Sequence, residues 1–246
     1  NIVLFGDPMQ LPQPIQGIHP GQSGVSALDY VVGGSRVIAP ELGIFMPVTR
    51  RMHPGICEFI SEAVYEGKLD CEDGAKRQSL TSADGRHLVG ASFHGVEHSG
   101  RSQVCPEEIE AIRETIGNLI GSTYSYRDGN ERRLTAGDIM VVAPYNAQVN
   151  ALAEALPAIR VGTVDKFQGQ EAPVCLVSMT TSSVDELPRD IEFLFSLNRI
   201  NVAVSRAQVL AMVFASPRLL EIPCRTVRQM TLVNTLKGWL FVAVTS

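Results

Sequence analysis

Short apolar runs alternate with segments of helical period along this chain, and this alternation constrains its fold more than any other feature. The runs at 138–143, 173–179 and 209–215 are apolar apart from Asp138 and Ser178, which is typical of strands buried on both faces of a sheet. Strands that are joined through helices pair in parallel, with right-handed crossovers that leave helices on both faces. We therefore expect an α/β domain with three layers, a parallel sheet between two layers of helices.

Turn residues and apolar periodicity set the bounds of the individual elements. Strands are expected over 2–5, 43–49, 88–96, 138–143, 160–163, 173–179 and 209–215. Helices are expected over 26–32, 54–65, 106–120, 145–156, 191–207 and 226–242. Residues 66–87 are charged and contain glycine, so they are predicted to form a loop.

Composition describes an ordinary globular protein with one local basic zone. The chain has 246 residues, 45% of them hydrophobic, and a net charge of −5. Residues 199–246 contain six basic side chains and one acidic one, so the rest of the chain carries a net charge of −10. A polyanion is therefore expected to bind at one place only. The apolar run at 239–244 is too short to cross a bilayer, and no membrane contact is expected.

Cysteines and histidines indicate neither a disulfide framework nor a metal site. The five cysteines are widely spaced and no Cys-x-x-Cys occurs, so a reducing cytoplasm is the expected location. Alternation along the strand at 88–96 puts His94 and His98 on one face and His87 on the other. His53 has no second His or Cys nearby, and we expect it to form a hydrogen bond at the start of a helix.

Two polar blocks in the second half of the chain suit the phosphate end of a nucleotide. In the first, 161–171, the chain leaves an apolar strand through a glycine-bearing turn. Gly169 would let the backbone approach a ligand closely, and Glu171 could accept hydrogen bonds from ribose hydroxyls. The second block is expected on a helix that places Arg199 and Arg206 two turns apart on one face, where a guanidinium can fork onto phosphate oxygens.

Other polar residues follow the ends of predicted strands, where open α/β sheets bind ligands. Asp7 could face a metal or a water, and Gln10 could reach a terminal phosphate; an aspartate that only caps the turn is the alternative. Arg50 and Arg51 stand between a strand and a helix and are well placed for phosphate, although a solvated surface pair is the commoner arrangement.

The helix start at 144–146 and the end of the strand at 173–179 are candidates for nucleic-acid contact. Free N–H groups at a helix amino terminus bind anions, and Tyr145 could stack on a base or simply pack under the helix. The hydroxyl-rich segment Thr180-Thr181 suits sugar-phosphate oxygens.

Six segments together resemble the motifs of superfamily 1 helicases, in the same order. They are Gly6-Asp-Pro-Met-Gln-Leu-Pro12, Arg51-Met-His-Pro54, Tyr65-Glu-Gly-Lys-Leu69, Pro144-Tyr-Asn-Ala-Gln148, Thr163 to Glu171 and Asn198 to Ala207. The resemblance covers essentially the whole chain and is to motifs III to VI of the branch that includes the nonsense-mediated-decay helicase, senataxin and the replication nuclease-helicases. The loop sequences most resemble bacterial proteins that join a RecB-like nuclease to such a helicase.

This resemblance implies a RecA-like domain of the P-loop NTPase type. Residues 1–35 would be the tail of a first RecA-like domain, and residues 36–246 a second RecA-like helicase domain. The chain contains no Gly-x-x-x-x-Gly-Lys-Ser/Thr, and no Asp-Glu pair follows a strand before the segment 6–12, so the phosphate cradle and the magnesium ligands are expected upstream of Asn1. ATP and Mg²⁺ are the implied cofactors, and the fragment alone is expected neither to hydrolyse ATP nor to unwind a duplex.

The resemblance also assigns the residues of a nucleotide site. Gln10 would sense the γ-phosphate, and Arg51 and Arg206 would act on it as arginine fingers. Glu171 would hold the ribose, with backbone clearance at Gly169.

The residues implied to face a single strand are Pro144, Tyr145, Asn146, Thr163, Asp165, Thr180 and Thr181. A tyrosine that stacks on the adenine usually precedes the motif IV arginine, but Arg50 stands there, and a guanidinium can also stack on a base. The implied partners are single-stranded DNA (or RNA), a first RecA-like domain and a RecB-like nuclease domain. A helicase-like clamp without ATPase activity is the alternative, whereas a dinucleotide-binding enzyme is disfavoured because no Gly-x-Gly-x-x-Gly follows a strand.

Overall fold

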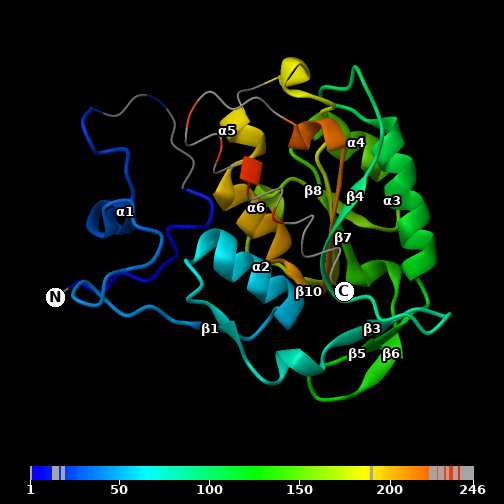
Figure 1. Cartoon of the computed structure of the whole chain (residues 1–246), viewed down its shortest axis with the longest axis horizontal. Coiled ribbons are helices and arrows are strands. Elements are labelled where there is room, and N and C mark those ends of the chain that lie inside the picture. Colours follow the sequence, from blue (N-terminus) through cyan, green and yellow to red (C-terminus); the bar gives the residue numbers. More distant parts are fainter. Residues whose placement is uncertain are drawn as a thin grey trace.

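A five-stranded parallel sheet forms the centre of the protein (Figure 1). The computed structural model describes residues 2–12, 17, 20–188 and 191–221, with five isolated positions beyond them. In spatial order the strands are β4 (Gly90–Gly95), β10 (Ala207–Ala215), β9 (Ala172–Ser178), β7 (Ile139–Val142) and β8 (Arg160–Gly162). The expected parallel α/β sheet is confirmed. The helix expected at 226–242 lies outside the described residues, apart from those isolated positions.

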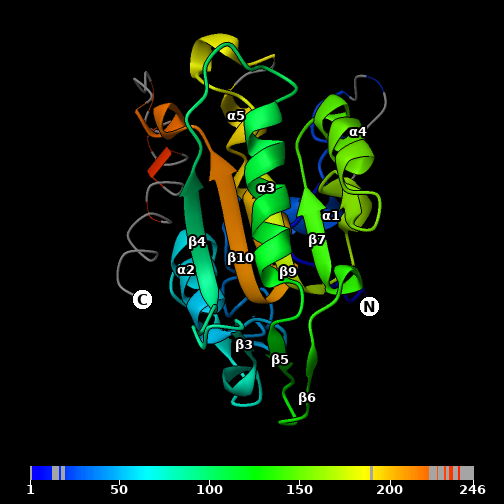
Figure 2. The ribbon, with the colours of Figure 1, turned by 90° about the vertical axis from the view of Figure 1, so that its right-hand side faces the viewer.

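Helices cover both faces of the sheet, which confirms the three expected layers (Figures 1 and 2). α2 (Pro54–Val64) and α6 (Leu197–Val204) lie on one face, and α3 (Pro106–Leu119) and α4 (Asn146–Ala155) lie on the other. The sheet is thereby enclosed on both sides, which is why its central strands are continuously apolar in sequence.

One apolar core lies on each face of the sheet. The core beneath α2 and α6 includes the fully buried Ile56, Ile60 and Phe195. The core on the opposite face includes the fully buried Ile112 and Leu152. Burial of this apolar surface is the main term that stabilises the three layers.

Short polar signals in the sequence fix where the helices begin. His53 precedes α2, and its Nδ1 accepts a hydrogen bond from the backbone N–H of Gly55 at 3.2 Å, as expected. Pro106 opens α3, with Glu107 and Glu108 in the first turn, where negative charge complements the helix dipole.

Very short strands build two further small sheets. The strand expected over 43–49 is confirmed only at Val48–Thr49, and the other strands of these two sheets are not predicted. The strands of the two sheets are β1 (Val48–Thr49), β2 (Asp70–Cys71), β3 (Ser79–Thr81), β5 (Thr123–Ser125) and β6 (Glu131–Arg133). The remaining short elements are the helices α1 (Ala27–Val32) and α5 (Ile191–Leu194) and the 3-10 helices Ala75–Arg77, Ala136–Asp138, Asp165–Phe167, Val184–Glu186 and Pro217–Leu220. β3, β5 and β6 pair antiparallel, and β1 pairs with β2. The loop predicted at 66–87 is therefore wrong in part, because strands of two or three residues carry no measurable periodicity.

The expectation of a buried strand over residues 2–5 is wrong. The described residues provide no hydrogen-bonded neighbour for this segment, and Ile2 and Phe5 are 88% and 90% exposed. A strand exists only as part of a ladder, so an apolar run without an adjacent strand stays extended but unpaired. Among the described residues, no helix is both long enough and apolar enough to span a bilayer.

One buried carboxylate beside the small sheet gives the fold a measurable pH dependence. Burial alone would raise the pKa of Asp138, but hydrogen bonds from Arg132 and Thr135 lower it to about 2. A depressed pKa contributes stability that is fully present above the ordinary value of 3.8 and is lost as the pH falls through about 2.

Asp138→Asn is therefore expected to lower the free energy of unfolding at pH 7 by on the order of 2 kcal/mol. The difference from the unmodified protein should narrow between pH 4 and pH 2, because Asp138 becomes protonated there. Denaturant unfolding at several pH values measures this difference in the free energy of unfolding. Glu110→Gln, at an exposed pair within α3, is the control and should change little. A loss that is the same at pH 7 and pH 2.5 would contradict the assignment.

Candidate functional site

The predicted site residues lie at two opposite edges of the parallel sheet. Glu171 and Arg206 immediately precede β9 and β10, so both stand at the amino ends of neighbouring strands. Thr163 follows β8, Pro144 follows β7, and Thr180 follows β9, so these three stand at the carboxyl ends. We call the two sets the amino edge and the carboxyl edge.

At the amino edge, Arg51 and Glu171 form an ion pair across 120 residues of chain. Arg51 Nε donates to Glu171 Oε2 at 2.6 Å, and Arg51 Nη1 donates to the backbone carbonyl of Ser205 at 3.0 Å. Gln208 Nε2 donates to the other carboxylate oxygen at 2.9 Å. Burial acts to raise the pKa of Glu171, but the hydrogen bonds from Arg51 and Gln208 outweigh it and the pKa falls. The carboxylate is therefore charged at neutral pH.

Arg206 lies at the same edge but is only 3% exposed. Its Nε donates to the carbonyl of Val202 at 3.0 Å, and its Nη1 to that of Gln170 at 3.2 Å. Burial lowers the pKa of the Arg206 guanidinium, and the positive charge of Arg51 lowers it further. The two guanidinium groups are thus close enough to repel each other.

The expected single helix over 191–207 is wrong, and with it the shared face of Arg199 and Arg206. The segment forms α5 and then α6, which ends at Val204, so Arg206 stands outside the helix in the turn to β10. Arg199 instead lies over the ring of Phe193 at 4.3 Å and approaches Asp165 Oδ2 at 3.4 Å.

A hollow of about 310 Å³ opens beside the ion pair of Arg51 and Glu171. Its lining residues are Thr49, Arg50, Arg51, Gln78, Arg127, Glu171 and Gln208. Its lining holds three guanidinium groups and one carboxylate, and Glu72 beside it pairs with Arg50 at 3.7 Å and with Arg127 at 3.0 Å. The balance is still positive, which suits phosphate oxygens. Arg127 comes from the turn between β5 and β6, donates to the carbonyl of Arg50 at 2.9 Å, and has no sequence signal that could have found it.

Gly169 lies two residues before Glu171 and has a φ of 82°. A side chain at this left-handed position would be strained, so the turn into the amino edge requires glycine. A second hollow, of about 710 Å³, adjoins the first and shares Gln78, Arg127 and Gln208 with it.

The loop at 7–10 is held by α6 rather than by the arginine cluster. Asp7 Oδ1 accepts from the backbone N–H of Met9 at 2.9 Å, which is the turn-capping alternative, and Oδ2 accepts from the Tyr65 hydroxyl at 2.6 Å. Asn201 Nδ2 donates to the carbonyl of Met9 at 2.9 Å. Asn198 Nδ2 donates to the backbone carbonyl of Gln10. Through α6, which ends next to Arg206, this loop is coupled to the amino edge.

At the carboxyl edge the predicted residues differ in exposure. Asn146 and Asp165 are exposed, and Pro144 and Thr163 are half-buried. Tyr145 is buried and stacks on Phe193 with ring centroids 5.9 Å apart, so the packing alternative describes it.

Thr180 and Thr181 are fully buried. The hydroxyl of Thr181 donates to the carbonyl of Ser102 at 2.9 Å. The expectation that these two hydroxyls face single-stranded nucleic acid is therefore not met in the described structure.

The expectation that His94 and His98 share one face of a strand is wrong, because β4 ends at Gly95 and His98 lies beyond it. His87 contacts the Thr81 hydroxyl, and His94 packs on the ring of Phe214. His98 is buried against Glu108, with Nε2 3.1 Å from Oε1, and Cys105 lies beside them. The sequence gives no sign of this last cluster, because its members are brought together only by the start of α3.

Comparison with known proteins assigns the family. The AAA domain family matches residues 39–218. Human 3'-5' exoribonuclease HELZ2 is 31% identical over an alignment of 179 positions, which covers 64% of this chain and 6% of that protein. DNA-binding protein SMUBP-2 of Rattus norvegicus is 29% identical over 232 aligned positions, which cover 84% of this chain and 21% of that protein. RNA helicase Mov10l1 of Mus musculus is 29% identical over 256 aligned positions, gaps included, which cover 91% of this chain and 21% of that protein.

This chain thus spans about a fifth or less of the length of each of these three relatives. The matched region covers the sheet, the helices on both of its faces, and both edges described above. The chain belongs to this AAA domain family and is a helicase domain of superfamily 1.

Proposed function

We propose that this chain is the second motor domain of an ATP-dependent helicase and that its amino edge receives the γ-phosphate of ATP. The observation that carries the proposal is the meeting of Arg51, Arg206 and Glu171 at the amino ends of β9 and β10. Two guanidinium groups that repel each other are stabilised by an anion between them. A triphosphate supplies such an anion, and its oxygens match the guanidinium fork.

ATP binding would require Arg51 to exchange partners. Its ion pair with Glu171 joins side chains that are 31% and 48% exposed, and such pairs contribute only about 0–1 kcal/mol. Arg51 can therefore turn from the carboxylate to a phosphate oxygen with little loss. Glu171 is then free to accept hydrogen bonds from ribose hydroxyls. Gln10, on the loop that α6 holds, would add a contact to the γ-phosphate.

Magnesium would be held elsewhere in the protein. The hollow at the amino edge is lined by three guanidinium groups and one carboxylate that is already paired. This set suits phosphate oxygens, whereas Mg²⁺ prefers several unpaired oxygen ligands. The phosphate cradle and the metal ligands would therefore come from an upstream lobe.

The single strand is proposed to run along the carboxyl edge, opposite the nucleotide. Asn146 and Asp165 are exposed there, and the free N–H groups at the start of α4 attract phosphate. ATP would draw the two lobes together, hydrolysis would release them, and alternate grip on the strand would produce translocation. The relatives' names mention both DNA and RNA; we propose single-stranded DNA, with RNA as the alternative.

Two partner domains are proposed for this chain. Ile2, Phe5, Ile44 and Met46 are large exposed apolar side chains, and apolar surface of this kind suits contact with an upstream RecA-like lobe. A RecB-like nuclease domain rests on the resemblance of the loop sequences alone.

The isolated chain is expected to show no ATP hydrolysis and no strand separation, because the proposed γ-phosphate residues act on a nucleotide held by another lobe. Phosphate release is measured with Mg²⁺, ATP and an oligodeoxythymidylate, and the full-length protein serves as the positive control. Metal-dependent ATP hydrolysis that copurifies with the isolated chain and is lost in its Arg51→Ala variant would contradict the proposal that another lobe holds the nucleotide.

A further inference from the structure

A buried polar network ties down the residues that follow β9 at the carboxyl edge. We call residues 178–183, which begin at the last residue of β9, the edge loop. Glu108, in the first turn of α3, is fully buried, and both of its carboxylate oxygens accept from the backbone N–H of Thr180, at 2.9 and 3.0 Å. The Ser178 hydroxyl donates to Glu108 Oε2 at 2.5 Å. One carboxylate therefore holds two residues of the edge loop.

Thr180 needs such a partner because its backbone is in an unfavourable conformation. Its φ is 70°, in the left-handed region, and a β-branched residue rarely adopts this region. Hydrogen bonds to a charged acceptor are stronger than those to a neutral one, and burial strengthens them further. The Glu108 carboxylate thus stabilises a backbone shape that Thr180 would not keep by itself.

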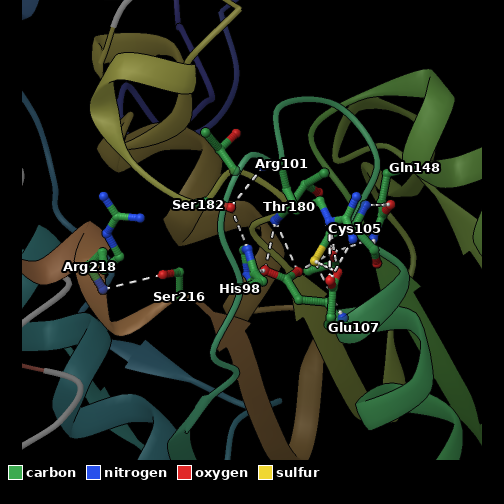
Figure 3. Close-up of polar contacts among 12 residues, drawn as sticks. His98, Arg101, Cys105, Glu107, Gln148, Thr180, Ser182, Ser216 and Arg218 are labelled. Atoms are coloured by element: carbon green, nitrogen blue, oxygen red, sulfur yellow. Dashed lines mark hydrogen bonds and ion pairs between the residues drawn. The ribbon is translucent and has the colours of Figure 1, made fainter.

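A second set of contacts joins the edge loop to the chain before α3 (Figure 3). His98 Nδ1 lies 2.7 Å from the Ser182 hydroxyl, and its Nε2 lies 3.1 Å from Glu108. The backbone N–H of Arg101 donates to the Ser182 hydroxyl at 3.0 Å, and the backbone N–H of Ser182 donates to the carbonyl of Arg101 at 2.9 Å. His98 therefore links the carboxylate to the far end of the loop.

The network also reaches α4, whose start forms the rest of the carboxyl edge. Gln148 is buried; its Nε2 donates to the Ser178 hydroxyl at 2.9 Å and its Oε1 accepts from the backbone N–H of Cys105 at 2.9 Å. Gln148 lies in the same first turn of α4 as the exposed Asn146. The edge loop, the start of α3 and the start of α4 are consequently fixed relative to one another.

Hydrogen bonds within the protein already occupy the side-chain atoms that could coordinate a metal ion. Donor atoms of His98, Cys105 and Glu108 all lie within 4.8 Å of one another. Both ring nitrogens of His98 and both carboxylate oxygens of Glu108 are engaged, and Cys105 Sγ accepts from the backbone N–H of Glu108 at 3.5 Å. A cation would have to displace these bonds, so the geometry favours a structural connection over a metal site.

We propose that Glu108 is a positioning residue for nucleic-acid binding: through the Ser178 hydroxyl and Gln148 it fixes the position of the start of α4. The inference rests on the proposed function of the carboxyl edge. Glu108 itself does not contact the nucleic acid, because it is fully buried. Removal of its side chain is therefore expected to lower the affinity for single-stranded nucleic acid, whereas ATP hydrolysis at the amino edge should continue.

The experiment titrates the ATPase activity of the full-length protein with oligodeoxythymidylate, and in parallel with oligouridylate. Glu108→Ala should raise the KM for the strand about tenfold and leave kcat at saturating strand within about twofold. Glu108→Gln keeps one oxygen acceptor for Thr180, so its KM should rise only about threefold. Glu110→Ala, at an exposed position of the same helix paired with Arg113, is the matched control and should behave as the unmodified protein.

The outcomes separate the two proposals. An unmodified protein that no strand stimulates would overturn the proposed function itself. A stimulated protein whose Glu108→Ala variant keeps the normal KM, or loses kcat at constant KM, would overturn only the positioning role. If Glu108→Ala does not fold, Glu108→Gln decides, and a KM equal to that of the unmodified protein overturns the inference.

Discussion

Arg51→Ala in the full-length protein is expected to slow ATP hydrolysis by roughly three to five powers of ten, the range found for arginine fingers in phosphoryl transfer. The fold should survive, because Arg51 is partly exposed and its ion pair with Glu171 contributes little to stability. Single-turnover phosphate release at saturating ATP and strand measures the chemical step. Thermal unfolding of the same preparation tests the fold.

A charge-matched control is available on the far face of the sheet. Arg113→Ala removes an exposed arginine of α3 that pairs with Glu110, and turnover should change less than twofold. Near-normal single-turnover rates for Arg51→Ala would remove this residue from the proposed mechanism, whatever its stability.

Arg206→Ala should reduce turnover by a similar factor, but it should also destabilise the domain. Arg206 is buried and donates to the carbonyls of Val202 and Gln170. Leaving a buried acceptor without its donor costs about 1–3 kcal/mol. We therefore expect a lower denaturant midpoint as well as lost activity.

Arg206→Lys separates the two effects. Lysine keeps the charge and can satisfy a carbonyl, so most of the stability should return, but an ammonium cannot fork onto phosphate oxygens and turnover should stay low. Arg113→Ala, which removes an exposed arginine of α3, is again the control for both measurements. An Arg206→Lys variant that hydrolyses ATP at the normal rate would refute the finger role.

Much of the fold follows from local patterns. Continuous apolar runs predicted β7, β9 and β10, because strands covered on both faces must be apolar throughout. Pro54 and Pro106 marked the starts of α2 and α3, since proline loses nothing at the first turn of a helix. The same approach failed for residues 2–5 and for the small antiparallel sheet. Whether those segments pair is decided by distant neighbours and not by their own composition.

The candidate site divides along the same line. Motif order and spacing pointed to Arg51, Glu171 and Arg206, because these residue types suit phosphate and ribose wherever they stand. No local pattern could show that Arg206 is buried, or that Arg127 reaches the same hollow from the turn between β5 and β6.

The sequence by itself determined the layered α/β class, the starts of the main helices and the kinds of side chain present at each motif. The tertiary structure alone decided which of these side chains meet. The spatial strand order β4-β10-β9-β7-β8 differs from chain order and places β9 beside β10, so Glu171 and Arg206, which precede these two strands, become neighbours at the amino edge. Periodicity and capping act over a few residues, whereas strand order is set by burial of apolar surface across the whole domain.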